Sequence, residues 1–266
     1  MPRRVAIAGL GSIGSKLARA LDKGVPGFVL SAVATRDAAK AEVLLSSLTN
    51  RPIIVPIAAL EGYADLVIEC APAPLLPAVI MPFLRAGKTA IVMSAGGLLE
   101  REDLIDLARA CGGQIILPSG ALLGLDAVTA AAQGTIHSVR MITRKPVCSL
   151  AGAPYLSTHQ IRIDNIKEPL KIFEGSAREA AQGFPANLNV AAALSLAGIG
   201  PERTIVEIWA DPTLSRNNHR IEVDADSASF SMSIANVPTE NPRTGRITAL
   251  SVIAYLRKIY APLRIG

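Results

Sequence analysis

The chain has 266 residues, of which 50% are apolar and 18% charged, and its formal net charge is +5 at pH 7. At about 150 residues per domain, this length suits one large domain or two modest ones. The basic residues are scattered and aromatic residues make up only 4%, which argues against a nucleic-acid-binding protein, and the absence of any apolar run of about 18 residues argues against a membrane span.

Strand-like and helix-like segments alternate through the first 120 residues. Apolar runs predict strands at 5–8, 28–34, 53–55, 66–68, 89–93 and 114–117. Helical spacing predicts helices at 15–21, 37–48, 77–85 and 100–110. Because these strands are apolar throughout, we expect a parallel sheet that is covered on both faces, which is the doubly wound Rossmann arrangement of the α/β class.

The pattern changes after Pro118. Strands are predicted at 139–143, 160–163, 170–173, 204–210, 219–223 and 230–234, and helices at 185–197 and 244–259. Short connections between strands favour a mainly antiparallel sheet. We therefore predict a dinucleotide-binding domain at 1–118, completed by the C-terminal helix in 241–266, and a catalytic and dimerisation α+β domain at 119–240.

The three cysteines, Cys70, Cys111 and Cys148, have no metal-ligand spacing. An odd and sparse set of cysteines indicates reduced thiols and a cytoplasmic protein. We expect no metal site.

A glycine-rich turn follows the first predicted strand. Residues 9–14 read Gly-Leu-Gly-Ser-Ile-Gly and match the G-x-G-x-x-G fingerprint of dinucleotide-binding folds. Gly9 permits the tight turn, Gly11 lets a pyrophosphate approach the backbone, and Gly14 allows close packing of helix on strand. Ser12 and Ile13 lie within the fingerprint just before the predicted helix, whose N-terminus would face the phosphates. The alternative is a glycine-rich turn without a ligand.

Arg36 follows the second predicted strand, where NAD-specific folds usually have an acidic residue that binds the ribose hydroxyl groups. Arg36 can hold a 2′-phosphate or lie over the adenine, and Asp37 comes slightly late. The sequence therefore predicts that NADP is accepted, alone or as well as NAD. The alternative is a solvated arginine in a loop.

Small residues follow the fourth and fifth strands. They include Cys70, Ala71, Ala95 and Gly96, at positions where a doubly wound sheet presents its loops to a ligand. Small side chains would let a ring or a ribose approach the backbone. The alternative, that these are ordinary small loop residues without a ligand, explains either loop equally well.

Histidine is scarce, and His219 is the strongest catalytic candidate. It follows a polar, turn-rich segment at the entry to a predicted strand. The ordinary pKa of histidine, near 6.5, suits proton exchange at neutral pH. The competing interpretation is a packing or surface residue, which is the stronger reading for His137 and His159.

Four further residues are candidate ligands of the substrate or cofactor. Asn187 and Asn189 either cap a helix or face the nicotinamide carboxamide. Ser119 ends the last strand of the first domain, where its backbone lines the nicotinamide site or forms a hinge. Because neighbouring strand residues point to opposite faces, only one of Arg144 and Lys145 can meet a substrate carboxylate. We take that residue to be Lys145.

Together these segments resemble the L-aspartate dehydrogenase family. Beyond the glycine fingerprint, the matching motifs are PSGALLGLD at 118–126, TRKP at 143–146, EGSAREAA at 174–181, FPANLNV at 184–190, NNH at 217–219 and NPRTG at 241–245. The family often has Lys and Ser at the positions of Arg243 and Gly245. The resemblance covers nearly the whole chain, and its motifs from 118 to 219 are much more specific than the fingerprint.

The resemblance implies a fold, an activity and several roles. It implies a Rossmann domain and a second α+β domain that dimerises through its sheet. It implies oxidation of L-aspartate to oxaloacetate and ammonia through iminoaspartate, with aspartate bound between the domains, and it allows a role in pyridine nucleotide biosynthesis. It also implies that His219 is the active-site histidine and that Ala121 and Asn189 contact the cofactor.

Two kinds of protein rival this interpretation. Other two-domain reductases usually carry a His-His pair ahead of a lysine, or Glu-Lys-Pro after the fifth strand, and this chain has neither. A non-catalytic dinucleotide sensor would need no reactive histidine. The sequence shows no DNA-reading helix or basic tail that would support such a sensor.

Overall fold

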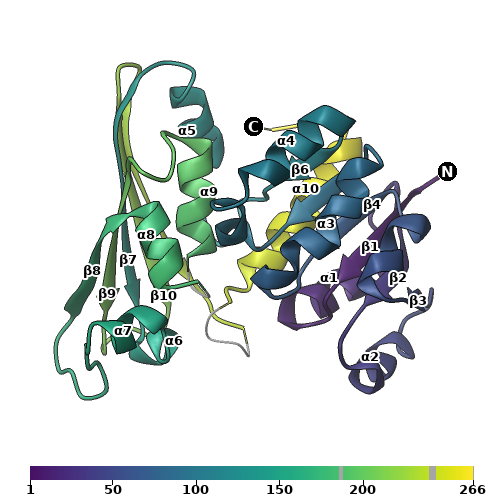
Figure 1. Cartoon of the computed structure of the whole chain (residues 1–266), viewed down its shortest axis with the longest axis horizontal. Helices are drawn as coiled ribbons and strands as arrows, with labels where there is room; N and C mark the ends of the chain where they lie inside the picture. The colour runs from purple at the N-terminus through teal and green to yellow at the C-terminus, as the bar shows by residue number, and fades with distance from the viewer. Residues whose placement is uncertain (186–187, 240–243, 266) are drawn as a thin grey trace. The chain divides into compact units, whose positions relative to one another are not determined.

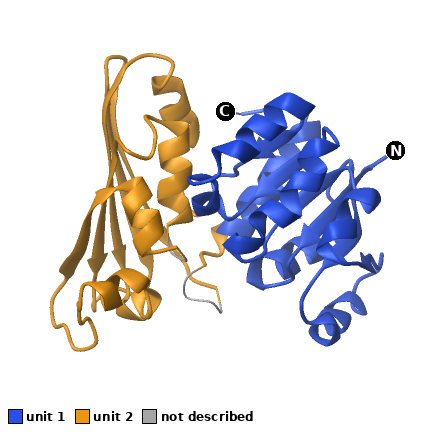
Figure 2. Cartoon of the chain, in the orientation of Figure 1, with its two compact units in different colours: residues 1–120, 248–266 blue, residues 121–247 orange. Residues whose placement is uncertain are grey.

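The computed structural model describes residues 1–185, 188–239 and 244–265. The chain divides into two compact units, coloured separately in Figure 2. Unit 1 contains residues 1–120 and 248–266, and unit 2 contains residues 121–247. Among the helices of the described segments, none is both long and apolar enough to cross a membrane.

Unit 1 has a six-stranded sheet in the order β3-β2-β1-β4-β5-β6, and each neighbouring pair is parallel. The strands are β1 (Arg3–Ala8), β2 (Phe28–Ala34), β3 (Ile53–Ile54), β4 (Leu66–Glu69), β5 (Thr89–Val92) and β6 (Gln114–Ile116). Successive residues of a strand point to opposite faces. Val5 and Ile7 of β1 accordingly enter one apolar core, while Ala6 and Ala8 enter another.

Helices cover both faces of this sheet (Figure 1). One core receives side chains from α1 (Ser12–Asp22), α2 (Ala38–Leu45) and α10 (Ile247–Tyr260). The other receives them from α3 (Leu76–Arg85), α4 (Glu102–Cys111) and the 3₁₀ helix η1 (Ile57–Tyr63). Two shorter 3₁₀ helices are η2 (Ala73–Leu75) and η3 (Ala95–Leu98). The expected doubly wound parallel sheet is confirmed.

Unit 2 has a five-stranded mixed sheet in the order β11-β10-β7-β9-β8. The strands are β7 (Ile136–Lys145), β8 (Leu170–Ser176), β9 (Thr204–Ala210), β10 (Asn217–Ala225) and β11 (Ser229–Asn236). The β7–β9 pair is parallel and the other pairs are antiparallel. The sheet is therefore mainly antiparallel, as expected.

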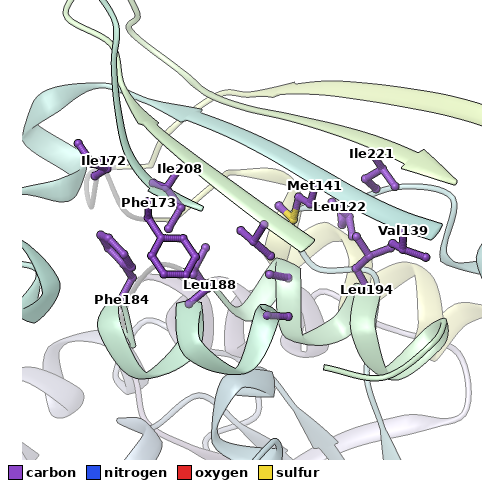
Figure 3. Packing of buried hydrophobic residues seen from close by; sticks show 14 of the residues in the cluster. Leu122, Val139, Met141, Ile172, Phe173, Phe184, Leu188, Leu194, Ile208 and Ile221 are labelled. Carbon is purple, nitrogen blue, oxygen red and sulfur yellow. The ribbon is translucent and has the colours of Figure 1, made fainter. Parts of the chain in front are cut away.

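Helices α5 (Leu125–Ala131), α8 (Ala177–Gly183) and α9 (Asn189–Ala197) lie along one face of this sheet (Figure 1). Two shorter helices are α6 (Val147–Leu150) and α7 (Pro154–Thr158). Figure 3 shows Phe173 of the sheet packed against Phe184 at the end of α8, and their ring centroids are 5.7 Å apart. The apolar core of unit 2 lies between these two layers.

Two predicted elements of unit 2 are wrong or displaced, and four of its helices were not predicted. Residues 160–163 form no strand, because Gln160 has a φ of 54° and Ile163 packs into the core from a loop. The helix expected at 185–197 begins at Asn189 instead. Four short helices, α5 to α8, were not predicted at all, since segments of four to seven residues carry little helical periodicity.

Candidate functional site

The loop between β1 and α1 needs glycine at two positions and is open at a third. Gly9 has a φ of +98°, and a Cβ there would lie 2.5 Å from the Cys70 carbonyl oxygen. A Cβ on Gly14 would overlap the Gly9 carbonyl oxygen, whereas a Cβ on Gly11 would meet no atom within 4 Å. The open side at Gly11 fits the close approach of a pyrophosphate.

The start of α1 suits an anion for a second reason. Its N-cap, Gly11, has no side chain to cap the helix, and its first turn carries no acidic residue. Ser12 and Ile13 are half-buried in this turn. Backbone N–H groups and the positive end of the helix dipole therefore face the loop without a competing carboxylate.

Arg36 and Asp37 follow β2 and differ in what they do locally. Arg36 is exposed. Asp37 is the N-cap of α2, and its Oδ1 accepts a hydrogen bond of 2.9 Å from the Lys40 backbone N–H. The first acidic residue after β2 is thus engaged in capping a helix.

The loops after β4 and β5 lie next to each other because those strands are neighbours in the sheet. Cys70 and Ala71 are half-buried after β4, and Ala95 is buried at the start of η3 with Gly96 beside it. Burial raises the pKa of the Cys70 thiol well above its ordinary range, and the nearby Glu69 carboxylate adds to this shift. Cys70 is therefore a protonated thiol rather than a nucleophile.

Ser119 and Ala121 lie in the turn that leaves β6. Ser119 is half-buried, and the backbone N–H of its neighbour Gly120 donates a 3.1 Å hydrogen bond to the Ser251 hydroxyl of α10. Within unit 2, the Ala121 carbonyl oxygen accepts a 2.8 Å hydrogen bond from the Asn236 side-chain amide. The turn is therefore held on both sides of its glycine.

A buried polar cluster ends the otherwise apolar, helix-covered face of the unit 2 sheet. Its members are Thr143, Lys145, Asn217, His219 and Asn236, each between 0% and 5% exposed. His219 pairs with Thr143 across the β10–β7 ladder, and Asn217 pairs with Asn236 across the β10–β11 ladder. Further along the same strands the inward residues are apolar, including Ile221 and Met141. Such a cluster at one end of a core is where a polar ligand could be bound.

His219 has one hydrogen-bond partner among the described residues, the Thr143 hydroxyl, at 2.6 Å from Nδ1. The Thr143 hydroxyl likewise has no other partner in the described part of the chain. A buried hydroxyl proton without an acceptor is costly, so the favoured arrangement has Thr143 donating to Nδ1. The imidazole then carries its proton on Nε2 and presents an N–H donor.

The pKa of His219 lies far below the ordinary histidine value near 6.5. Burial is the largest cause, and the positive charge of Lys145 adds to it; together they lower the pKa of His219 to about 3. The ring is therefore neutral at physiological pH.

Arg144 and Lys145 lie on opposite faces of the sheet, as the alternation of strand residues requires. Lys145 is buried in the polar cluster, while the Arg144 guanidinium lies 4.9 Å from the centroid of the Trp209 ring on the other face. Asn189 is the first residue of α9 and is exposed. Asn187 lies outside the described residues.

Sequence reasoning did not single out Thr143, Asn217, Asn236 or Glu69 as site residues. Thr143 and Asn217 lie two residues from Lys145 and His219 on the same strands, so strand alternation could have placed them on the same face. Asn236 follows only from its pairing with Asn217. Glu69, a fully buried carboxylate at the end of β4, could have been found as the one charged residue in an apolar strand.

Each of the two units is matched by a model of a known protein family. The C-terminal domain model of aspartate dehydrogenase matches residues 126–259, and the NAD-binding domain model of homoserine dehydrogenase matches residues 9–118. An L-aspartate dehydrogenase of Bradyrhizobium diazoefficiens is 64% identical over 99% of this chain and 94% of its own length. The chain belongs to the aspartate dehydrogenase family.

Two other comparisons agree with this family. L-aspartate dehydrogenase 3 of Bordetella bronchiseptica is 54% identical over 98% of this chain and 97% of its own length. The crystal structure of aspartate dehydrogenase from Thermotoga maritima has a TM-score of 0.74, with 24% identity and full coverage of both chains, and it supports the fold. The family that the sequence resembles is confirmed, and with it an oxidoreductase that uses a nicotinamide dinucleotide.

Proposed function

We propose that the chain oxidises L-aspartate to iminoaspartate with NAD or NADP, and that water then converts iminoaspartate to oxaloacetate and ammonia. The reverse reaction is the reductive amination of oxaloacetate. The observation that carries this proposal is the buried cluster of His219, Thr143 and Lys145 in a member of this family. This cluster contains both the Lys145 ammonium group and the His219 imidazole, a combination that suits a substrate with carboxylates beside a reacting amine.

The cofactor is assigned to unit 1. Gly9, Gly11 and Gly14, with Ser12 and Ile13, hold the pyrophosphate, and Cys70, Ala71, Ala95 and Gly96 line the nicotinamide half. Ala121 and Asn189 of unit 2 complete the contacts that the family resemblance implies. When bound, the nicotinamide cofactor would supply the acceptor for a hydride from the α carbon of the substrate.

Arg36 is the residue that we expect to admit NADP. It is exposed after β2, and the neighbouring Asp37 is engaged at the N-cap of α2. A guanidinium can pair with a 2′-phosphate through two hydrogen bonds. NAD lacks this phosphate, so Arg36 distinguishes the two cofactors.

Lys145 is assigned to a substrate carboxylate, with Ser119 and Asn187 as further ligands. Lys145 is 2% exposed, and its positive charge contributes to the low pKa of His219. A bound dicarboxylate would offset that charge and raise the pKa of the imidazole toward its ordinary value. The bound substrate would thereby bring the pKa of the His219 imidazole closer to the range that its own oxidation needs.

His219 is the proposed catalytic residue. The α-amine must be neutral before a hydride leaves the α carbon, and His219 either takes that proton or polarises the developing imine. The low pKa and the Thr143 hydrogen bond favour the second role, in which Nε2–H donates a hydrogen bond to the imine nitrogen; the substrate ammonium group then loses its proton to water before hydride transfer. Holding the reacting groups in place then supplies a large share of the rate.

We also propose a homodimer formed through the sheet of unit 2. The face away from the helices carries half-buried Ile142, Ile205 and Trp209. Arg140 on the same face forms ion pairs with Glu174 and Glu207. A second copy of this chain could cover these apolar side chains, and light scattering after gel filtration would report the mass.

The direct test is a steady-state comparison of NAD and NADP over a panel of amino acids, followed by absorbance at 340 nm. We expect reduction with L-aspartate, and oxaloacetate-dependent oxidation of the reduced cofactor only when ammonia is added. Turnover of oxaloacetate without ammonia would indicate a malate-type enzyme. Cofactor binding without turnover of any substrate would indicate a dinucleotide sensor.

A further inference from the structure

Glu69 is a buried carboxylate that the proposed chemistry does not use. It is the last residue of β4 and is 0% exposed. Burial raises the pKa of Glu69, while hydrogen bonds from its neighbours oppose that shift. A buried carboxylate is costly unless it is well hydrogen-bonded, so its partners indicate what it does.

Those partners lie in two different loops. Oε1 accepts hydrogen bonds from the Ala71 backbone N–H at 2.9 Å and from the Ser94 hydroxyl at 3.0 Å. Oε2 accepts from the backbone N–H groups of Met93 at 3.1 Å and Ser94 at 3.0 Å. The Ser94 hydroxyl also lies 3.2 Å from the Ala71 carbonyl oxygen. One side chain therefore joins the loop after β4 to the loop after β5.

The glycine loop is in contact with the same structure. The Cys70 backbone N–H donates to the Ala8 carbonyl oxygen at 2.8 Å, and the Cys70 carbonyl oxygen occupies the space that a side chain on Gly9 would need. A shift of Cys70 and Ala71 would consequently press on the turn that precedes α1.

The sheet order separates the two halves of a bound dinucleotide. The glycine loop follows β1, and Arg36 follows β2 on one side of it, whereas the loops held by Glu69 follow β4 and β5 on the other side. With the pyrophosphate at the glycine loop and the adenosine toward β2, the nicotinamide half extends toward β4 and β5.

We propose that Glu69 is a positioning residue for the nicotinamide half of the cofactor, because its carboxylate fixes the loops that contain Ala71 and Ser94. It acts through these backbone groups. This inference rests on the cofactor assignment proposed above, but it does not depend on the identity of the substrate.

The test measures nucleotide binding by calorimetry in Glu69→Gln, without any amino acid present. A glutamine keeps one acceptor oxygen and places an NH₂ donor against backbone N–H groups, so at least one loop loses its partner. We use whichever dinucleotide the parent protein binds more tightly, NAD or NADP, and its matching adenylate half, 5′-AMP or 2′,5′-ADP. We expect the Kd of the dinucleotide to rise about tenfold or more and that of the adenylate half to change less than about twofold.

Glu61→Gln is the matched control, since Glu61 is a partly buried carboxylate of unit 1 that pairs with Lys88 outside these loops. It should leave both dissociation constants unchanged. If Glu69→Gln does not fold, Ser94→Ala replaces it, because it removes the hydroxyl shared by Glu69 and Ala71 and should weaken only the dinucleotide. Equal weakening of both ligands, or no weakening of either, would overturn the proposal. Failure of aspartate as a substrate would leave it standing.

Discussion

At the scale of single residues, two glycines of one loop should respond oppositely to an added methyl group. Gly14→Ala would place a Cβ against the Gly9 carbonyl oxygen, and overpacking of this kind lowers the free energy of unfolding by about 1–3 kcal/mol. Gly11→Ala should leave stability within about 0.5 kcal/mol but raise the Kd of the dinucleotide about tenfold or more. Urea unfolding and calorimetry check the pair. An unchanged Kd in Gly11→Ala would contradict the assignment of Gly11 to the pyrophosphate.

Thr143 offers a second prediction, through the tautomer of His219. Thr143→Val removes the hydroxyl that lies 2.6 Å from Nδ1 and that we infer to be the donor. We expect kcat to fall about tenfold, as loss of one hydrogen bond allows. Thr143→Ser retains the donor and should retain activity. In ¹⁵N NMR spectra the parent protein should carry the ring proton on Nε2, and the valine variant should not do so uniformly. A parent ring protonated on Nδ1 would refute this orientation.

The low pKa of His219 predicts a pH dependence of stability. The folded ring has a pKa of about 3, whereas the unfolded chain has an ordinary value near 6.5. The unfolded state therefore binds more protons between these values, so the contribution of His219 is complete above pH 6.5 and is lost as the pH falls toward 3. Through His219, the free energy of unfolding changes by at most about 1.4 kcal/mol per pH unit.

This dependence is measured as the free energy of unfolding at pH 7.5 and pH 5 for the parent protein and for His219→Gln. The parent should lose more stability than the variant on acidification. Parallel losses in the two proteins would mean that the ring is not held neutral by burial.

At the scale of elements, the loop between β2 and α2 tests cofactor choice. Arg36→Ala should raise the Kd of NADP about tenfold, as expected for a lost charge-assisted hydrogen bond, and change that of NAD less than about threefold. Arg51→Ala is a matched control, because Arg51 pairs with Glu42 of α2 on the surface of the same unit. An equal effect of Arg36→Ala on the Kd of both cofactors would contradict the assignment of Arg36 to the 2′-phosphate of NADP.

Elements differ in how far the sequence predicts them. The apolar strands of unit 1 are buried on both faces, so their composition alone marks them. In unit 2, the alternation of Ile161 and Ile163 imitates a strand although Gln160 has a positive φ. Helix α8 carries a capping box, formed by Ser176 and Glu179, which is a sequence signal that could have predicted its start.

The residues of the candidate site also differ in how far the sequence predicts them. The fingerprint reveals Gly9 and Gly14 because backbone geometry demands glycine there, and Gly11 because the open backbone at that position suits a phosphate. The partners of His219 depend on strand register, which brings Thr143 to it from 76 residues away. The pKa of His219 depends on burial, and no local pattern in the sequence specifies burial of a polar residue.

At the scale of the whole molecule, the proposed reaction needs groups from both units. The glycine loop and the loops held by Glu69, which we assign to the cofactor, belong to unit 1, and His219 and Lys145, which we assign to the substrate, belong to unit 2. Each unit has its own apolar core, so a substitution in one site should leave the other unit folded. Loss of catalysis with retained cofactor binding is therefore the expected signature of a substitution at His219 or Lys145.

The central claim is hydride transfer from L-aspartate to the cofactor, and its most direct measurement follows the hydrogen on the α carbon. The parent protein is mixed with L-aspartate deuterated at the α carbon and with the oxidised cofactor, and the reduced cofactor is analysed by mass spectrometry. We expect one deuterium in each reduced nicotinamide and none when the substrate is unlabelled. Reduced cofactor without deuterium, or aspartate consumed without any reduced cofactor, would contradict hydride transfer from aspartate.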